Sequence, residues 1–149
     1  MSEEPEFFTY TREEFLDEFV HPDDRPAVEE ARQRRALQVR AWLHALRSGD
    51  PVTRRLVAEA IDRLLDDGPA LGRPLADRIS GSRLHSLKEL RPGSSGTTEV
   101  RILFIFDPAR NAVLLVAGDK SGRWEQWYRD AIPAAEAAYE AYLKGRAQR

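Results

Sequence analysis

Five basic residues lie in or beside short apolar runs of the sequence: Arg83, Lys88, Arg91, Arg101 and Lys120. A cation inside an apolar strand loses hydration free energy unless it meets an anion or reaches the surface of the sheet. Arginine suits phosphate because its planar guanidinium stays charged and can donate two parallel hydrogen bonds. The five residues therefore indicate a phosphate-binding concavity at one end of a sheet. Internal ion pairs with Glu89 or Glu99 would explain the same charges, and the sequence leaves both interpretations open.

Aromatic residues follow the last of these apolar runs, in the segment VLLVAGDKSGRWEQWY, residues 113–128. Trp124 and Tyr128 could supply a platform on which an exposed nucleic-acid base stacks. Trp127 is expected to pack between a C-terminal helix and the sheet. We interpret residues 119–128 as a loop that carries site residues at the end of a buried strand.

The composition excludes several kinds of site. The chain has no cysteine, so it can form neither disulfides nor cysteine-ligated zinc, and it cannot use thiolate catalysis. Its three histidines show no ligand spacing, and we expect neither a metal nor a cofactor. The sequence also lacks a Walker loop, a dinucleotide fingerprint and a serine elbow.

Membrane contact is not expected. No apolar stretch approaches the roughly 20 residues of a membrane span. The acidic start MSEEPEFF is unlike the basic start of a signal peptide. The sequence therefore predicts a cytoplasmic protein.

Charge is distributed unevenly along the chain. Residues 1–30 contain eleven Asp/Glu and two Arg, whereas residues 31–149 contain twenty-one Lys/Arg and fourteen Asp/Glu. A basic body can attract a polyanion, and an acidic arm can compete for the same surface. Two solvated surfaces of opposite sign would give the same counts, so both interpretations stay open.

The first half of the chain has helical periodicity. Apolar residues at helical spacing predict a short helix over residues 11–20, and Asp24 with Pro26 marks the start of a second helix that ends at Gly49. Asp50 and Pro51 mark the start of the next helix, which ends at Gly68. The last two helices should form an antiparallel hairpin.

The second half changes to strand periodicity. Three short apolar runs, 83–90, 98–106 and 111–118, are separated by turn sequences and predict an antiparallel meander. The central run is apolar almost without alternation, so both of its faces should be covered. Residues 132–145, with Pro133 near their start, predict a C-terminal helix. The fold class is therefore α+β, with a helical hairpin packed on a small meander.

Three segments, GSRLHSLKELRP, TEVRILFIFDPARNAVLLVAGDKSGRWEQWY and AIPAAEAAY, resemble a known family. This family is the HigB-type, phage-derived branch of the RelE/ParE toxins of bacterial type II toxin–antitoxin systems. The resemblance implies a RelE-like, microbial-RNase-like domain over residues 36–149, after an acidic, mainly helical extension over residues 1–35. It also implies a first strand before the hairpin, and only residues 6–10, EFFTY, have strand character there.

The resemblance implies a ribosome-dependent mRNA endonuclease. Such enzymes need no metal: the 2′-hydroxyl attacks the adjacent phosphate and leaves a 2′,3′-cyclic end. By position, the catalytic residues would be Lys88, Arg101, Lys120 and Tyr128, all on one face. The RNA-binding residues would be Arg83, Arg91 and Trp124. Several relatives carry a C-terminal histidine or lysine pair, whereas this chain has the single Lys120 there.

The same resemblance implies two partners, mRNA on the ribosome and a cognate antitoxin of the helix-turn-helix, HigA-like kind. The acidic segment could act as a built-in antagonist of the basic body, or it could be a solvated extension. One alternative function is a cleavage-incompetent module that binds the ribosome, DNA gyrase or another partner. Another is a scaffold whose charged strand residues are all paired internally.

Overall fold

The computed structural model describes residues 8–9 and 37–147. Its centre is a five-stranded sheet with the order β1-β5-β4-β3-β2, in which every neighbouring pair is antiparallel. The strands are β1 (Phe8–Thr9), β2 (Ala76–Arg78), β3 (Lys88–Leu90), β4 (Val100–Phe106) and β5 (Ala112–Asp119). The predicted meander corresponds to β3, β4 and β5, and the α+β fold class is confirmed.

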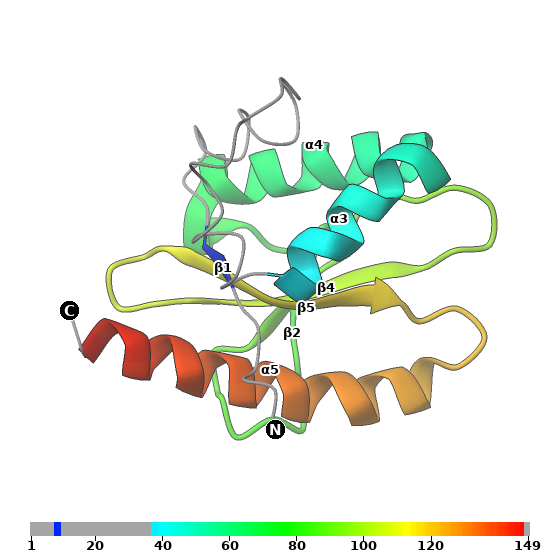
Figure 1. The fold of residues 1–149 in the computed structure, drawn as a ribbon. Helices are drawn as coiled ribbons and strands as arrows, with labels where there is room; N and C mark the ends of the chain where they lie inside the picture. The colour runs from blue at the N-terminus through cyan, green and yellow to red at the C-terminus, as the bar shows by residue number, and fades with distance from the viewer. Residues whose placement is uncertain (1–7, 10–36, 148–149) are drawn as a thin grey trace.

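Helices cover both faces of this sheet (Figure 1). Helices α3 (Leu37–Gly49) and α4 (Pro51–Asp67) lie on one face and meet at Asp50, and a 3-10 turn (Gly68–Ala70) follows α4. Helix α5 (Trp124–Ala147) runs across the other face. The predicted helix over residues 11–20 lies outside the described residues, and so do residues 24–36 of the predicted second helix.

Helix α4 begins and ends where its capping residues predict. The Asp50 carboxylate accepts hydrogen bonds from the Thr53 backbone N–H, at 3.1 Å, and from the Thr53 hydroxyl, at 2.6 Å. Pro51 occupies the first turn, where its missing N–H costs nothing. Gly68 ends the helix with φ +64°, a conformation that glycine adopts without steric cost. The local sequence therefore determines both ends of this helix.

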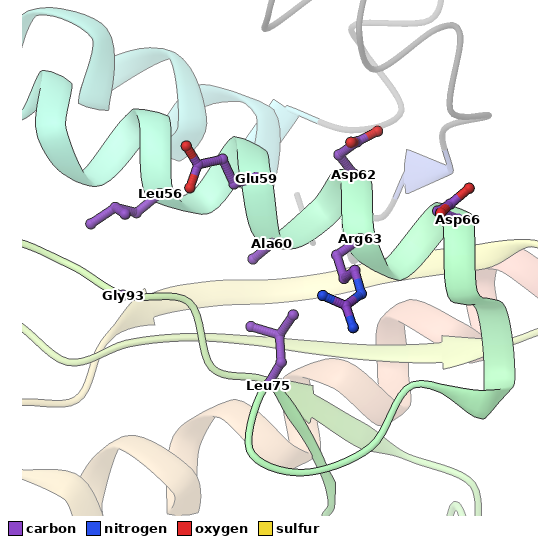
Figure 2. Close-up of a pocket in the computed structure, with 8 residues that line it drawn as sticks. All are labelled: Leu56, Glu59, Ala60, Asp62, Arg63, Asp66, Leu75 and Gly93. Carbon is purple, nitrogen blue, oxygen red and sulfur yellow. The ribbon is translucent and has the colours of Figure 1, made fainter.

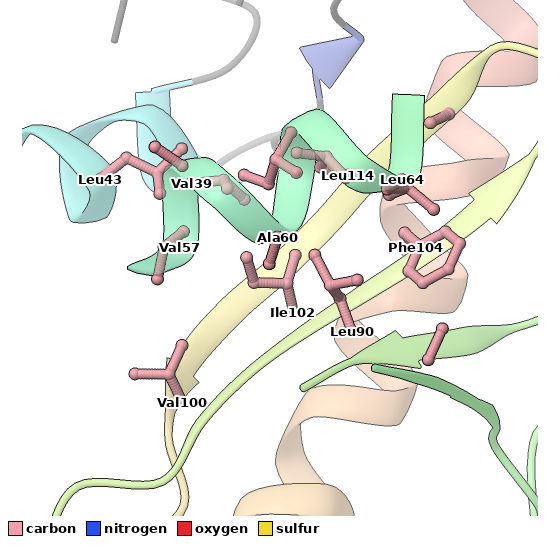
Figure 3. Close-up of a cluster of buried hydrophobic side chains, with 14 of the residues drawn as sticks. Val39, Leu43, Val57, Ala60, Leu64, Leu90, Val100, Ile102, Phe104 and Leu114 are labelled. Carbon is pink, nitrogen blue, oxygen red and sulfur yellow. The ribbon is translucent and has the colours of Figure 1, made fainter. Parts of the chain in front are cut away.

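Alternation along β4 creates two separate cores. Val100, Ile102 and Phe104 pack against α3 and α4, as Figure 3 shows, whereas Leu103 and Ile105 pack against α5. Because successive side chains of a strand point to opposite faces, Arg101 projects toward the α5 side. The prediction that the central strand is covered on both faces is confirmed.

Three elements, β2, β3 and α5, differ from the sequence prediction. Within the predicted strand 83–90 only residues 88–90 pair, and the short β2 was not predicted because three residues carry no readable alternation. Helix α5 begins at Trp124, so the second half of the predicted loop 119–128 is helical and Pro133 lies inside the helix. Proline removes one backbone hydrogen bond, and burial of Trp127, Ala131 and Ala135 against the sheet holds the helix together across it.

The first strand implied by the resemblance is present. Phe8 and Thr9 pair with Leu114 and Val113 of β5, at the outer edge of the sheet. A strand far ahead of the helical pair in sequence therefore reaches the sheet, as EFFTY indicates.

Candidate functional site

Several charged side chains and one tyrosine gather on the α5 side of the sheet, where β3, β4 and β5 meet the first turns of α5. We call this group the Arg101 cluster; it consists of Glu89, Arg91, Arg101, Lys120 and Tyr128. Arg101 belongs to β4, Lys120 follows β5, and Tyr128 lies in the second turn of α5. Glu89 is paired with Leu103 of β4 and so points to the same face as Arg101.

Glu89 connects two members of the cluster. One carboxylate oxygen, Oε1, accepts a hydrogen bond from Nε of Arg91 at 2.8 Å and forms an ion pair with its Nη2, also at 2.8 Å. The other, Oε2, accepts the Tyr128 hydroxyl at 2.5 Å. Arg91 also lies 3.5 Å from the Asp77 carboxylate of β2, and it is the more exposed partner of these ion pairs. These contacts hold a guanidinium and a phenol side by side.

The protonation of Tyr128 follows from its surroundings. Burial and then the Glu89 carboxylate raise the pKa of Tyr128 to about 12, because both disfavour the phenolate. Lys120 places its ammonium 5.3 Å from the centre of the Tyr128 ring and 3.7 Å from the Glu99 carboxylate. At neutral pH the tyrosine is therefore a neutral hydrogen-bonding group beneath a cation.

Arg101 differs from the other cations of the cluster. Its Nη1 donates to the Val100 carbonyl at 2.7 Å, and its buried Nε has no hydrogen-bond partner in the part of the chain that the structure describes. No carboxylate among residues 8–9 and 37–147 forms an ion pair with it. Its charge and its hydrogen bonding to the phenol also lower the pKa of Tyr128, against the larger effects of burial and Glu89. Arg101 thus offers, next to Tyr128, a guanidinium whose charge no carboxylate of the described residues neutralises.

The two tryptophans of α5 have different environments. Trp124 is 58% exposed and lies one helical turn before Tyr128, so both rings are on one side of the helix. Trp127 is 7% exposed and belongs to the core between α5 and the sheet. The packing role predicted for Trp127 is therefore confirmed, and Trp124 remains available to contact a ligand.

The structure does not bring Lys88 to this cluster. Lys88 is paired with Phe104, whose side chain packs on the α3 and α4 side, so it projects from the opposite face. Its Nζ lies 3.4 Å from the Pro69 carbonyl and 5.9 Å from the centre of the Phe106 ring. The prediction that Lys88 shares one face with Arg101 and Tyr128 is wrong. Lys88 is the strand neighbour of Glu89, and adjacent side chains of a strand point to opposite faces.

Arg83 is also separate from the cluster. Its guanidinium lies 3.6 Å from the carboxylates of Glu136 and Glu140, in the middle of α5. Tyr128 and Glu136 are eight residues apart, about 12 Å along a helix. Arg83 therefore contacts the flank of α5 rather than its first turns.

A hollow of about 370 Å³ lies on the other side of the molecule (Figure 2). Leu56 and Ala60 of α4 form one wall, and Leu75 and Gly93 face them from the loops beside β2 and β3. Acidic residues and Arg63 of α4 line its rim, and none of the predicted site residues contributes to it.

The described residues form neither a metal-ligand group nor a membrane-spanning helix. Nowhere in the described ranges do three His, Asp or Glu side chains come together as metal ligands would. Helices α3, α4 and α5 are each too short or too polar to cross a membrane.

Sequence reasoning missed the central position of Glu89. It named Glu89 only as an ion-pair partner for Lys88 or Arg101, and neither of them pairs with a carboxylate among the described residues. Within SLKELRP, strand alternation puts Lys88 and Glu89 on opposite faces. Alternation could therefore have indicated that Glu89, and not Lys88, faces the same side as Arg101. The contact between Glu89 and Tyr128 could not be predicted in this way, because it depends on where α5 lies on the sheet.

Comparison with known proteins gives a consistent result. Residues 42–140 match the family described as phage-derived protein Gp49-like. A Mycobacterium tuberculosis protein named as the candidate toxin HigB2 is 53% identical over 106 residues, which cover 71% of this chain and 51% of that protein. A second, named as the candidate toxin HigB3, is 46% identical over 106 residues, covering 71% and 88%. This chain thus spans about half the length of HigB2. No solved structure matches it significantly.

Proposed function

This chain belongs to the phage-derived, Gp49-like family and is of the HigB type, and we propose that it is the toxin of a type II toxin–antitoxin system. We further propose that it cleaves mRNA on the ribosome, with the Arg101 cluster as the site. A cognate antitoxin, of the helix-turn-helix kind, would be its partner.

The guanidinium of Arg101, which no carboxylate of the described residues neutralises, is the observation that carries the proposal. A half-buried arginine without a carboxylate partner favours a bound anion, because an uncompensated charge that is partly removed from water costs free energy. A phosphate of an RNA backbone supplies oxygens that match the guanidinium fork. Lys120 is a second cation in the same cluster, and the exposed Trp124 ring offers a surface on which a base can stack.

The proposed reaction needs charge stabilisation and positioning. The 2′-oxygen forms a bond to phosphorus and loses its proton, the bond from phosphorus to the 5′-oxygen breaks, and that oxygen gains a proton. Negative charge develops on the phosphoryl oxygens, where Arg101 and Lys120 would stabilise it. Tyr128 keeps its own proton at neutral pH, since its pKa is raised to about 12. It would therefore orient the substrate by hydrogen bonding rather than act as a base.

A binding module without cleavage activity is the second candidate. Two observations favour it: the Tyr128 hydroxyl already donates to Glu89, and the cluster contains no histidine. Such a protein would use the same cations to bind the ribosome or another partner and would leave RNA intact.

A purified translation reaction separates these candidates. We expect the wild-type chain to cut a defined mRNA on translating ribosomes and to leave a 2′,3′-cyclic phosphate. Arg101→Ala should abolish cutting, whereas Arg55→Ala, which removes an exposed arginine paired with Glu59 on α4, should not. Intact mRNA with tight ribosome binding by the wild type would overturn the endonuclease and favour the binding module.

A further inference from the structure

We propose that Glu89 is a positioning residue, which holds Arg91 and Tyr128 in the orientation needed to face an RNA backbone. The inference rests on the proposed function and adds to it a residue that binds no RNA itself. It concerns how the Arg101 cluster is assembled before any substrate arrives.

Glu89 is buried within the cluster. Its side chain is 3% exposed, although it ends in a carboxylate. Buried polar side chains in the described part of the chain are Thr53, Glu89 and Asp107. Thr53 belongs to the capping contacts of α4, and Asp107 holds the turn between β4 and β5 against the end of α5. Glu89 is the one that lies among the cations of the cluster.

The two carboxylate oxygens of Glu89 have different partners. Oε1 is occupied by Arg91, at 2.8 Å from both Nε and Nη2, and Oε2 is occupied by the Tyr128 hydroxyl at 2.5 Å. These partners come from different elements, since Arg91 follows β3 and Tyr128 belongs to α5. One carboxylate thus fixes a helix and a strand end relative to each other. A charged hydrogen bond is stronger than a neutral one, so both orientations are well determined.

The contact with Glu89 also determines what the lone pairs of the Tyr128 phenol can accept. Because the Tyr128 proton points at Glu89, its oxygen lone pairs are left for donors on other sides, such as Arg101 or an RNA hydroxyl. Without Glu89 the hydroxyl would lose the acceptor that orients it, and Arg91 would lose its hydrogen bond and its ion pair with this carboxylate. Glu89 has neither the exposure nor a free oxygen to act as the base of the reaction.

The test compares Glu89→Gln with Glu136→Gln. Glu136 is a matched control because it also lies against α5 and pairs with an arginine, Arg83, but it is outside the cluster. Both changes remove one negative charge and keep the side-chain size. We expect Glu89→Gln to lower the cleavage rate on saturated ribosomes at least tenfold while changing the half-saturating concentration little. Glu136→Gln should leave both unchanged.

A second readout does not depend on cleavage. With 13C-labelled tyrosine, NMR titration follows the Tyr128 hydroxyl, whose signal is assigned by Tyr128→Phe. In Glu89→Gln the pKa of Tyr128 should fall below the wild-type value of about 12, because an amide has replaced the carboxylate that contacts the phenol. In Glu136→Gln the pKa of Tyr128 should equal the wild-type value. If Glu89→Gln does not fold, Glu89→Asp keeps the charge but is one methylene too short to reach both partners, and it should show the same loss of rate.

The outcomes are distinguishable. Unchanged cleavage in folded Glu89→Gln, or an unchanged Tyr128 pKa, would overturn the positioning role. Losses from Glu89→Gln and Tyr128→Phe that simply multiply in the double variant would also overturn it, since residues acting through one another are not additive. A wild-type chain that never cuts RNA would overturn the proposed function alone, and the titration would still decide whether Glu89 orients Tyr128.

Discussion

The contact between Gly118 and Trp127 gives a sharp test of how α5 is placed on the sheet. Gly118 lies in β5 opposite Arg101, and the indole of Trp127 rests on it. A Cβ at position 118 would lie 2.7 Å from the indole Nε1 and 3.4 Å from Cε2. The first distance is far below ordinary contact, so Gly118→Ala forces the buried indole, and with it the first turns of α5, to move.

The size of the effect follows from that geometry. Overpacking a core by one methyl group costs about 1–3 kcal/mol of unfolding free energy. Trp127 has few alternatives, because it is 7% exposed and enclosed by the α5 core. Tyr128 is the next residue, and a displacement of about 1 Å at a catalytic group can lower a rate about 100-fold. Gly118→Ala should therefore lose both stability and cleavage.

The assay is urea unfolding combined with the cleavage rate of the folded protein. Gly72→Ala is the matched control, because its Cβ would meet nothing within 4 Å and its φ is not positive. We expect the control to stay within about 0.5 kcal/mol of the wild type. A Gly118→Ala variant as stable and as active as the control would refute the reasoning, since Trp127 could not then lie on this glycine.

Three further predictions concern other contacts. Asp107→Ala should cost about 3 kcal/mol in urea unfolding, because it removes the buried carboxylate that Arg146, Tyr142 and Asn111 share; an unaltered unfolding midpoint would contradict this. At alkaline pH the unfolding free energy should fall between about pH 10 and 12, because folding raises the pKa of both Tyr128 and Tyr142 to about 12 from 10.0. Tyr142→Phe should flatten that slope, and an unfolding free energy that stays constant across this range would contradict the assignment. The Arg101→Lys variant should cut RNA at least about tenfold more slowly than the wild type, since an ammonium group cannot donate the two parallel hydrogen bonds of a planar guanidinium.

Much of the fold was predictable because local chemistry determines it. Asp50, Pro51 and Gly68 define α4, and apolar runs define β4 and β5. The start of α5 was not predictable in the same way. Pro133 resembles a first-turn residue, and only burial against the sheet shows that the helix begins nine residues earlier, at Trp124.

The candidate site was predictable in part. Arg101, Lys120 and Tyr128 come together as the resemblance implies, although their roles stay a prediction. Lys88 does not join them, because strand alternation assigns it to the face of α3 and α4. Glu89 acquires its importance from Tyr128, thirty-nine residues later in the chain, and no local pattern reports a contact of that range.

The most direct test of the central claim is inducible expression of the wild type, Arg101→Ala and Lys88→Ala in a bacterial host, with growth scored and mRNA 5′ ends mapped. We predict that the wild type and Lys88→Ala stop growth and create new mRNA ends within translated frames. Arg101→Ala should do neither while accumulating to the same level. Growth arrest and new ends that persist in Arg101→Ala, or that disappear only in Lys88→Ala, would contradict the assignment of the site to the Arg101 cluster.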